Sequence, residues 1–246
     1  MKVAALYDIH GNLPALDAVL REVRAEGVDQ IVVGGDVVLG PMPKECLTRV
    51  LELDIPTLFI KGNCDREVLT RMSGLSAPSA LPPQVQESLS WVASQLSPKH
   101  RSSMDEWSST AFLNIGPLGK VLFCHATPQN DMDMFTKLTP EAKVLSMLGA
   151  VDASVIVCGH THMQFDRKVG RYRVVNAGSV GMPFAEPGAY WLLLGEDVAC
   201  KRTEYDVMGA AERIRETRYP QAGEFASRNV LQPPPEADML QRLTAA

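Results

Sequence analysis

The first 63 residues alternate short, continuous apolar runs with amphipathic stretches. This pattern predicts strands at 2–7, 29–36 and 56–63 and helices at 14–26 and 44–53. Within 14–26, Leu16, Val19, Leu20 and Val23 recur at the spacing of one helical face. Strands that are buried on both faces read as continuous apolar runs, and strand–helix alternation at this spacing is typical of right-handed βαβ units. We therefore expect a parallel sheet in this half of the chain.

The pattern changes after residue 72. Residues 73–83 are small and rich in proline and predict a loop, and 84–96 and 98–107 predict two helices that Pro98 separates. Further strands are predicted at 112–116, 120–126, 153–160, 167–179 and 189–195, and further helices at 139–149 and 206–217. A tight turn is expected at Gly170, inside the 167–179 stretch.

These elements predict one domain over residues 1–246, in which two sheets stack and the helices lie outside them. Residues 73–110 are expected to form a helical insertion or cap, and 220–246 a partly irregular C-terminal tail.

The composition excludes few classes of protein. The apolar fraction of 46% and the charged fraction of 22% are those of an ordinary globular protein. A net charge of −5 argues against a broad nucleic-acid footprint but not against a small phosphorylated ligand, because bound metal ions would dominate the local field. The five cysteines form no CxxC pair, which favours reduced thiols and a cytoplasmic location. We interpret the N-terminus as a first strand rather than a signal peptide, and no apolar run reaches membrane-spanning length.

Candidate metal ligands stand where five of the predicted strands end. They are Asp8, His10, Asp36, Asn63, His125, His160 and His162. Taken singly they are weak signals, since a D-x-H pair arises by chance and an Asn in this place is often a turn residue. However, four of the five histidines in the chain belong to this set. Together the side chains would suffice for two adjacent cations that keep open positions for water and substrate.

Four of these positions carry more specific expectations. Asp36 ends an apolar strand behind two glycines, and a carboxylate can bridge two cations through its two oxygens. The amide oxygen of Asn63 suits a hard or borderline ion. The pair of histidines in G-H-T-H, at 159–162, is the most specific local motif.

The series D-x-H, G-D, G-N-x-D, H and G-H-x-H resembles the calcineurin-like metallophosphoesterase superfamily, from residue 3 to about residue 194. It is most similar to the small bacterial and archaeal phosphodiesterase branch, through HGNLPAL at 10–16, GDVVLGPMPKEC at 35–46 and VVNAGSVGMP at 174–183. The resemblance implies a four-layer α/β/β/α sandwich with two stacked mixed β-sheets, the metallo-dependent phosphatase-like fold.

The resemblance also implies a metal-dependent phosphoric ester hydrolase with two divalent ions. The first ion would be held by Asp8, His10, Asp36 and His162, and the second by Asp36, Asn63, His125 and His160. A hydroxide that bridges the ions would attack phosphorus, with Asp36, Asn63 and His125 as catalytic residues. Manganese is the expected metal, with iron, nickel, cobalt or zinc as alternatives.

One position departs from the family pattern. Many relatives have His where this chain has Cys64, and a thiol with a reference pKa of about 8.5 is a poorer general acid there. We therefore expect weak action on alkyl phosphomonoesters and better action on diesters with good leaving groups.

Substrate contacts are expected from Asn12, Cys64 and Arg66. The alternatives are a helix-capping Asn12 and a solvated Arg66. Asp131 and Asp133 lie in the loop after 123–128. We expect them to be solvated, with a position in the lining of the cleft as the alternative.

The leading hypothesis is thus a phosphodiesterase that acts on a small phosphoester, with a nucleotide as one candidate. Alternatives are a phosphomonoesterase or nucleotide phosphatase of the same fold, a non-catalytic scaffold that keeps the fold, an exonuclease, and a mononuclear zinc hydrolase. The acidic balance weighs against stable nucleic-acid binding, and a mononuclear site would leave Asp36 and Asn63 without a clear role.

Overall fold

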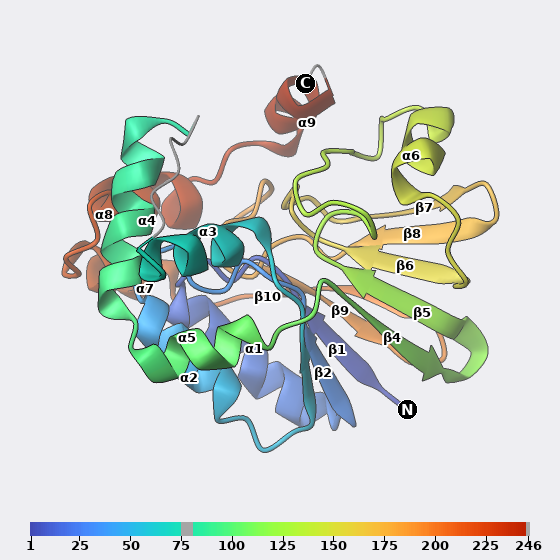
Figure 1. Cartoon of the computed structure of the whole chain (residues 1–246), viewed down its shortest axis with the longest axis horizontal. Coiled ribbons are helices and arrows are strands. Elements are labelled where there is room, and N and C mark those ends of the chain that lie inside the picture. The colour runs from blue at the N-terminus through green and yellow to red at the C-terminus, as the bar shows by residue number, and fades with distance from the viewer. Residues whose placement is uncertain (75–80, 245–246) are drawn as a thin grey trace.

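Two five-stranded sheets form the centre of the computed structural model, which describes residues 1–74 and 81–244 (Figure 1). The first sheet has the strand order β10-β9-β1-β2-β3. Its strands are β1 (Val3–Leu6), β2 (Gln30–Val33), β3 (Thr57–Phe59), β9 (Ala189–Leu194) and β10 (Val198–Thr203). Strands β1, β2 and β3 run parallel, as their apolar runs predict, whereas β9 and β10 pair antiparallel.

The second sheet has the order β4-β5-β6-β8-β7. Its strands are β4 (Thr110–Ile115), β5 (Gly119–Cys124), β6 (Val155–Cys158), β7 (Phe165–Val169) and β8 (Tyr172–Asn176). The three central strands are parallel and the two edge strands antiparallel. Both sheets are therefore mixed, and the expected α/β class with two mixed sheets is confirmed.

Strand β1 shows why the strands read as unbroken apolar runs. Ala4 and Leu6 lie in the core that faces helix α1 (Leu13–Glu26), while Val3, Ala5 and Tyr7 lie in the core between the two sheets. Side chains alternate across a strand, so a strand with both faces buried needs apolar residues throughout. The Tyr7 hydroxyl donates to the carbonyl of Val157 across the inter-sheet layer at 3.2 Å.

The remaining helices lie outside the sheets. They are α2 (Pro43–Leu51), α3 (Asn63–Met72), α4 (Pro83–Gln95), α5 (Pro98–Asp105), α6 (Glu141–Leu148), α7 (Val207–Arg215), α8 (Ala222–Phe225) and α9 (Glu236–Thr244), with short turns of other helix types at Gly116–Leu118 and Ala226–Leu231. Helix α6 covers the outer face of the second sheet through Val144 and Leu148. The helices α1 and α2 cover the outer face of the first sheet, which completes four layers (Figure 1).

Most of the predicted elements are present. Helices α4, α5, α6 and α7 lie where helices were expected, and the tight turn at Gly170 joins β7 to β8. Residues 75–80 of the expected loop at 73–83, and 245–246 of the tail, lie outside the described residues.

Three elements differ from the sequence expectations. Strand β3 ends at Phe59 rather than at residue 63, and helix α3 begins at Asn63. Strand β10 escaped prediction because only Thr203 of its six residues is buried, so it carries no apolar run. The tail that we expected to be partly irregular contains α8, α9 and the helical turn at Ala226–Leu231, and it is irregular between that turn and α9.

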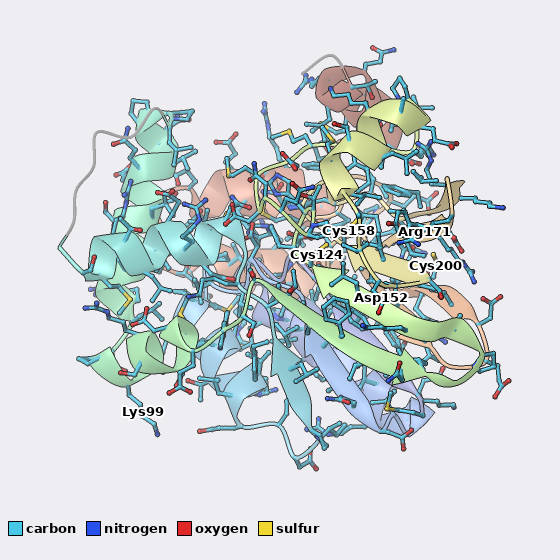
Figure 2. All side chains as sticks on the ribbon, turned by 45° about the vertical axis from the view of Figure 1, so that its right-hand side comes forward. Lys99, Cys124, Asp152, Cys158, Arg171 and Cys200 are labelled. Carbon is cyan, nitrogen blue, oxygen red and sulfur yellow. The ribbon has the colours of Figure 1, made fainter. Side chains whose placement is uncertain are left out.

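The five cysteines are all unpaired. Cys124 and Cys158 lie close together at the ends of neighbouring strands, whereas Cys200 lies away from them on the first sheet (Figure 2). Among the described helices, none is both long enough and apolar enough to cross a bilayer.

Candidate metal centre

The expected ligands converge at the carboxyl ends of the parallel strands. Asp8 and His10 follow β1, and Asp36 follows β2. His125 follows β5, and His160 with His162 follow β6, so the second sheet contributes from the opposite side. Because carboxyl ends of parallel strands meet at one edge of a sheet, residues that are far apart in the chain become neighbours there.

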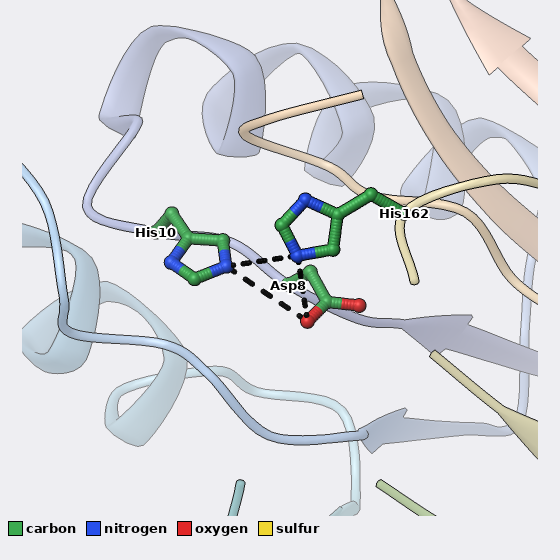
Figure 3. Close-up of side chains that lie close together, drawn as sticks. All are labelled: Asp8, His10 and His162. Carbon is green, nitrogen blue, oxygen red and sulfur yellow. Dashed lines mark hydrogen bonds and ion pairs between the residues drawn. The ribbon is translucent and has the colours of Figure 1, made fainter. Parts of the chain in front are cut away.

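Asp8, His10 and His162 form the first group (Figure 3). The Nε2 atoms of the two histidines lie 3.2 Å apart. Asp8 Oδ1 lies 3.4 Å from His162 Nε2 and 3.9 Å from His10 Nε2. All three side chains are buried, so a cation placed among them would be shielded from bulk water.

Asp36, His125 and His160 form the second group, in which the ligand atoms lie within 4.8 Å of one another. Asn63 joins it, since its Oδ1 lies 3.0 Å from His125 Nε2.

A single oxygen of Asp36 faces both groups. Its Oδ2 lies 3.5 Å from His125 Nε2 and 3.9 Å from His10 Nε2. Its Oδ1 accepts the backbone N–H of Cys64 at 2.8 Å. We expected the carboxylate to bridge through both oxygens; the N–H of Cys64 instead leaves Oδ2 as the atom directed at the two groups.

The histidine tautomers show that these groups suit cations. The Nδ1 atoms of His10, His125 and His162 each lie within 3.0 Å of a carbonyl oxygen, from Leu39, Gly34 and Met182 respectively. A carbonyl only accepts, so each Nδ1 carries a proton and each Nε2 faces the centre, where it offers a lone pair whenever the ring is neutral. His10 and His162 then direct two lone pairs at each other across 3.2 Å. A proton or a metal ion is required between such atoms, and this second-layer carbonyl contact is the usual support of a metal-bound imidazole.

Unpartnered atoms point to the same conclusion. Within residues 1–74 and 81–244, Asp8 Oδ1 and His160 Nε2 are buried without a hydrogen-bond partner. A buried polar atom left unpaired costs about 1–3 kcal/mol. Metal ions coordinated by these two atoms would remove this cost. The side chains that are present therefore fit a metal centre.

The local electrostatics are those of closely packed acids and imidazoles. Burial opposes charge on Asp36, but the neighbouring His125 and His10 lower its pKa below the ordinary value. Burial alone would lower the pKa of His125, and the Asp36 carboxylate outweighs it and raises that pKa to about 10. Burial and the proximity of His125 lower the pKa of His160 to about 4. Metal-free protein would thus hold a proton at His125, which a bound ion would displace.

Strained backbone conformations occur at several of the candidate ligands. Among the residues that the structure describes, the non-glycine positions with positive φ are Asp8, His10, Asp36, His160 and His162. This conformation is disfavoured for residues with a Cβ, costs on the order of 1–3 kcal/mol each and concentrates at functional sites. The sequence pattern does not predict this strain, which distinguishes five of the seven candidate ligands from the other described non-glycine residues.

Asp65 is a supporting residue to which the sequence analysis gave no role. Its carboxylate is fully buried and accepts the backbone N–H groups of Asp36 at 2.8 Å, Val37 at 3.0 Å and Gly62 at 3.1 Å. It therefore fixes the loop that carries Asp36 to the start of α3. The fourth position of G-N-x-D was the available signal.

The N-A-G-S stretch supports the site from the other side. Ser179 Oγ donates to the carbonyl of Asp8 at 2.7 Å, and Asn176 Nδ2 donates to the carbonyl of Gly159 at 2.6 Å. These bonds tie the loops of Asp8 and His160 to the segment after β8. The resemblance noted in this stretch therefore corresponds to loop support.

The expected substrate contacts differ in their surroundings. Asn12 is fully buried, caps α1 by accepting from Ala15 N and donates to the carbonyl of Gly181, which favours its capping alternative. Cys64 is half-buried, and its Sγ lies within 4.8 Å of ligand atoms of His10 and Asp36.

Arg66 lies beside the second group, but its charge is already paired. It donates to both carboxylate oxygens of Asp131, at 2.7 and 3.1 Å. Asp131 pairs with Arg66 and lines the same pocket as His125, which favours the cleft-lining alternative for Asp131. Asp133 also has a partner, since it accepts from Thr127 Oγ1 at 2.7 Å.

The chain is similar in sequence and in fold to known proteins. The model of the calcineurin-like phosphoesterase superfamily domain matches residues 1–197. Phosphodiesterase YfcE of Escherichia coli is 28% identical over 207 residues, which cover 80% of this chain and 89% of that protein. The uncharacterised protein MJ0912 of Methanocaldococcus jannaschii is 27% identical over 241 residues, covering 89% of this chain and 94% of the relative.

Two solved structures share the fold at lower identity. Hypothetical protein PH1004 of Pyrococcus horikoshii has a TM-score of 0.79 at 21% identity, covering 92% of this chain and 97% of its own. A metallophosphoesterase from Sphaerobacter thermophilus has a TM-score of 0.71 at 23% identity, covering 94% and 100%. The convergent acids and imidazoles thus stand on the scaffold of a known family: the chain belongs to the calcineurin-like phosphoesterase superfamily.

Proposed function

We propose that this protein is a dinuclear metal-dependent phosphodiesterase. The observation that carries the proposal is the pair of ligand groups on either side of Asp36 Oδ2, with opposed lone pairs in the first group. In this proposal Asp8, His10 and His162 hold one ion, Asn63, His125 and His160 hold the other, and Asp36 contacts both. Manganese is the proposed ion, with iron, nickel, cobalt or zinc as alternatives.

Two bound ions would lower the pKa of a shared water and neutralise charge on the phosphoryl oxygens. The chain itself positions the ligand side chains. Leu39, Gly34 and Met182 hold the imidazoles through their carbonyl groups, and Asp65 holds the Asp36 loop. Such support keeps the ligands in one geometry through the reaction, so little reorganisation is needed when charge develops.

Cys64 supports the proposed preference for esters with good leaving groups. Burial, together with the charge of Asp36, raises the pKa of its thiol well above the ordinary value. The thiol therefore keeps its proton at neutral pH and is a weak acid for an alkoxide leaving group. Esters whose leaving group needs no proton, such as aryl diesters, are then the favoured substrates.

A polar pocket beside His125 supports a small phosphoester substrate. It has a volume of about 390 Å³, and its lining includes Lys61, Arg66 and Trp107. Asp131 neutralises Arg66, whereas the Lys61 side chain, among the residues that the structure describes, donates only to the backbone carbonyl of Asp105. We propose that this pocket receives a polar or anionic part of the substrate. The unpaired cysteines favour a cytoplasmic location.

The test is a kinetic comparison of manganese-loaded protein on an aryl diester, bis(p-nitrophenyl) phosphate, and an alkyl phosphomonoester, glycerol 3-phosphate. We expect the diester to be the better substrate, and we expect Asn63→Ala to abolish its turnover. His100→Asn is the matched control, because His100 lies on α5 away from both ligand groups and should leave turnover unchanged. Faster turnover of the monoester, or metal-loaded protein that cleaves neither ester, would overturn the proposal.

A further inference from the structure

A second pocket opens beside the first ligand group and has a different chemistry. It has a volume of about 330 Å³ and is bounded at one end by His10. Its apolar walls come from Leu39, Val85, Met182, Tyr219, Phe225 and Pro234. This size is within the range of pockets that hold small organic ligands.

Two elements outside the sheets build this pocket. Helix α4 supplies Val85, and the C-terminal segment supplies Tyr219 and Phe225. Figure 1 shows α4 and α8 side by side at the same edge of the molecule, and the Ser88 hydroxyl on α4 donates to the Gln221 side chain. Tyr219, Phe225 and Pro234 lie after residue 197, beyond the part of the chain that the family model matches, whereas Leu39, Val85 and Met182 lie within it.

The walls are held in place. Tyr219 packs edge-on against Trp91 of α4, with ring centroids 5.5 Å apart, and Phe225 is 3% exposed. The turn after α8 is wound so that Gln232 N–H donates to Ser227 C=O, a five-residue step that is rare in proteins and frequent at functional sites. That turn places Arg228 and Asn229 on the pocket lining.

We infer that this pocket binds an uncharged apolar substituent, alkyl or aryl, of the phosphoester whose phosphoryl group lies at the metal centre. The inference rests on the proposed function, and it adds a substrate class: an ester with one apolar arm beside His10. His10 is the link, because the same imidazole belongs to the first ligand group and lines the pocket. The polar arm would occupy the pocket that contains His125 and Lys61, so the two arms of a diester would be distinguished by polarity.

The test measures the binding of phosphonates, which are not hydrolysed, by calorimetry on manganese-loaded protein. Methylphosphonate, butylphosphonate and 3-hydroxypropylphosphonate share the metal-binding group and differ in the arm. Since burial of each methylene favours binding by about fourfold, butylphosphonate should bind at least about tenfold more tightly than methylphosphonate. It should also bind more tightly than the isosteric hydroxypropyl compound.

Two variants assign that gain to the pocket. Val85→Trp fills it from α4, and Gln84→Trp does so from a neighbouring exposed lining position, which guards against misfolding of the first variant. Both variants should reduce the ratio of butylphosphonate affinity to methylphosphonate affinity to about one. The affinity for methylphosphonate should stay within about twofold of that of the parent protein. Ser90→Trp is the matched control, because Ser90 is exposed on the same helix and does not line the pocket.

Equal affinities for butylphosphonate and methylphosphonate, in protein that cleaves diesters, would overturn this inference and leave the proposed function standing. A butyl preference that survives both filling variants would also overturn it, since the arm would then bind elsewhere. Manganese-loaded protein that binds no phosphonate and cleaves no ester would overturn the proposed function together with it.

Discussion

Asp65 Oδ2 accepts the backbone N–H of Asp36 at 2.8 Å, across a separation of 29 residues in the chain. The same carboxylate holds the N–H groups of Val37 and Gly62. The side chain that positions the shared ligand thus comes from the first turn of α3 and not from the strand that Asp36 follows.

Replacement of Asp65 by Ala should destabilise the metal-free protein. The change leaves several buried N–H groups unpaired, so we expect the free energy of unfolding to fall by about 3 kcal/mol. Urea denaturation measures it, and metal titration should show weaker binding because the Asp36 loop loses its support. Asp152→Asn is the control, since Asp152 pairs with Lys120 on the surface and should change neither quantity. An Asp65→Ala variant as stable as the parent protein would refute the supporting role.

Cys64→His should broaden the range of esters that are cleaved. An imidazole with a reference pKa of about 6.5 donates a proton to an alkoxide more readily at neutral pH than the buried thiol does. We expect turnover of an alkyl phosphomonoester to rise by at least about tenfold, with a smaller change for an aryl diester. Cys64→Ser separates acid catalysis from size, because a hydroxyl should give no such rise. A Cys64→His variant without improved monoester turnover would show that acid strength at this position is not limiting.

His125 should make the stability of the metal-free protein depend on pH. Its pKa in the folded protein is about 10, above the reference of about 6.5. Folding therefore favours the protonated form of His125. The contribution of His125 to the free energy of unfolding is complete below about pH 6.5 and is lost as the pH rises through about 10. Thermal denaturation in chelator should show a decline in stability over this window, and His125→Gln should reduce that decline. An unchanged decline in the variant would assign it to other groups.

Metal binding should release protons. The ion and the His125 proton compete for the same Nε2 lone pair, so at pH 7.5 calorimetry in buffers of different ionisation enthalpy should detect proton release. Asn63→Ala weakens the site without removing a titrating ligand, and the number of protons released per bound ion should stay the same. Binding without proton release would mean that His125 is neutral in the metal-free protein or lies outside the metal site.

The fold was predictable from sequence where burial leaves a pattern. Strand β1 is buried on both faces and reads as an apolar run, and the hairpin at Gly170 carries its own turn signal. Strand β10 was not predictable, because an exposed edge strand alternates too weakly to stand out. The order of the predicted elements indicated two stacked sheets, and the family resemblance added the four-layer arrangement.

The candidate site was predictable as a set of residues but not as a geometry. Asp8, Asp36 and His125 stand at strand ends, and parallel strands bring such ends together. The selection of Oδ2 on Asp36 depends on the N–H of Cys64, and the pocket beside His10 depends on contacts between α4 and the C-terminal segment. These are long-range contacts that neither periodicity nor motif spacing reports.

The most direct test of the central claim is anomalous diffraction from crystals of the manganese-loaded protein. We predict two anomalous peaks about 3.5–4 Å apart, one beside Asp8, His10 and His162, the other beside Asn63, His125 and His160, with Asp36 Oδ2 between them. A single peak, or peaks away from these side chains, would contradict the account.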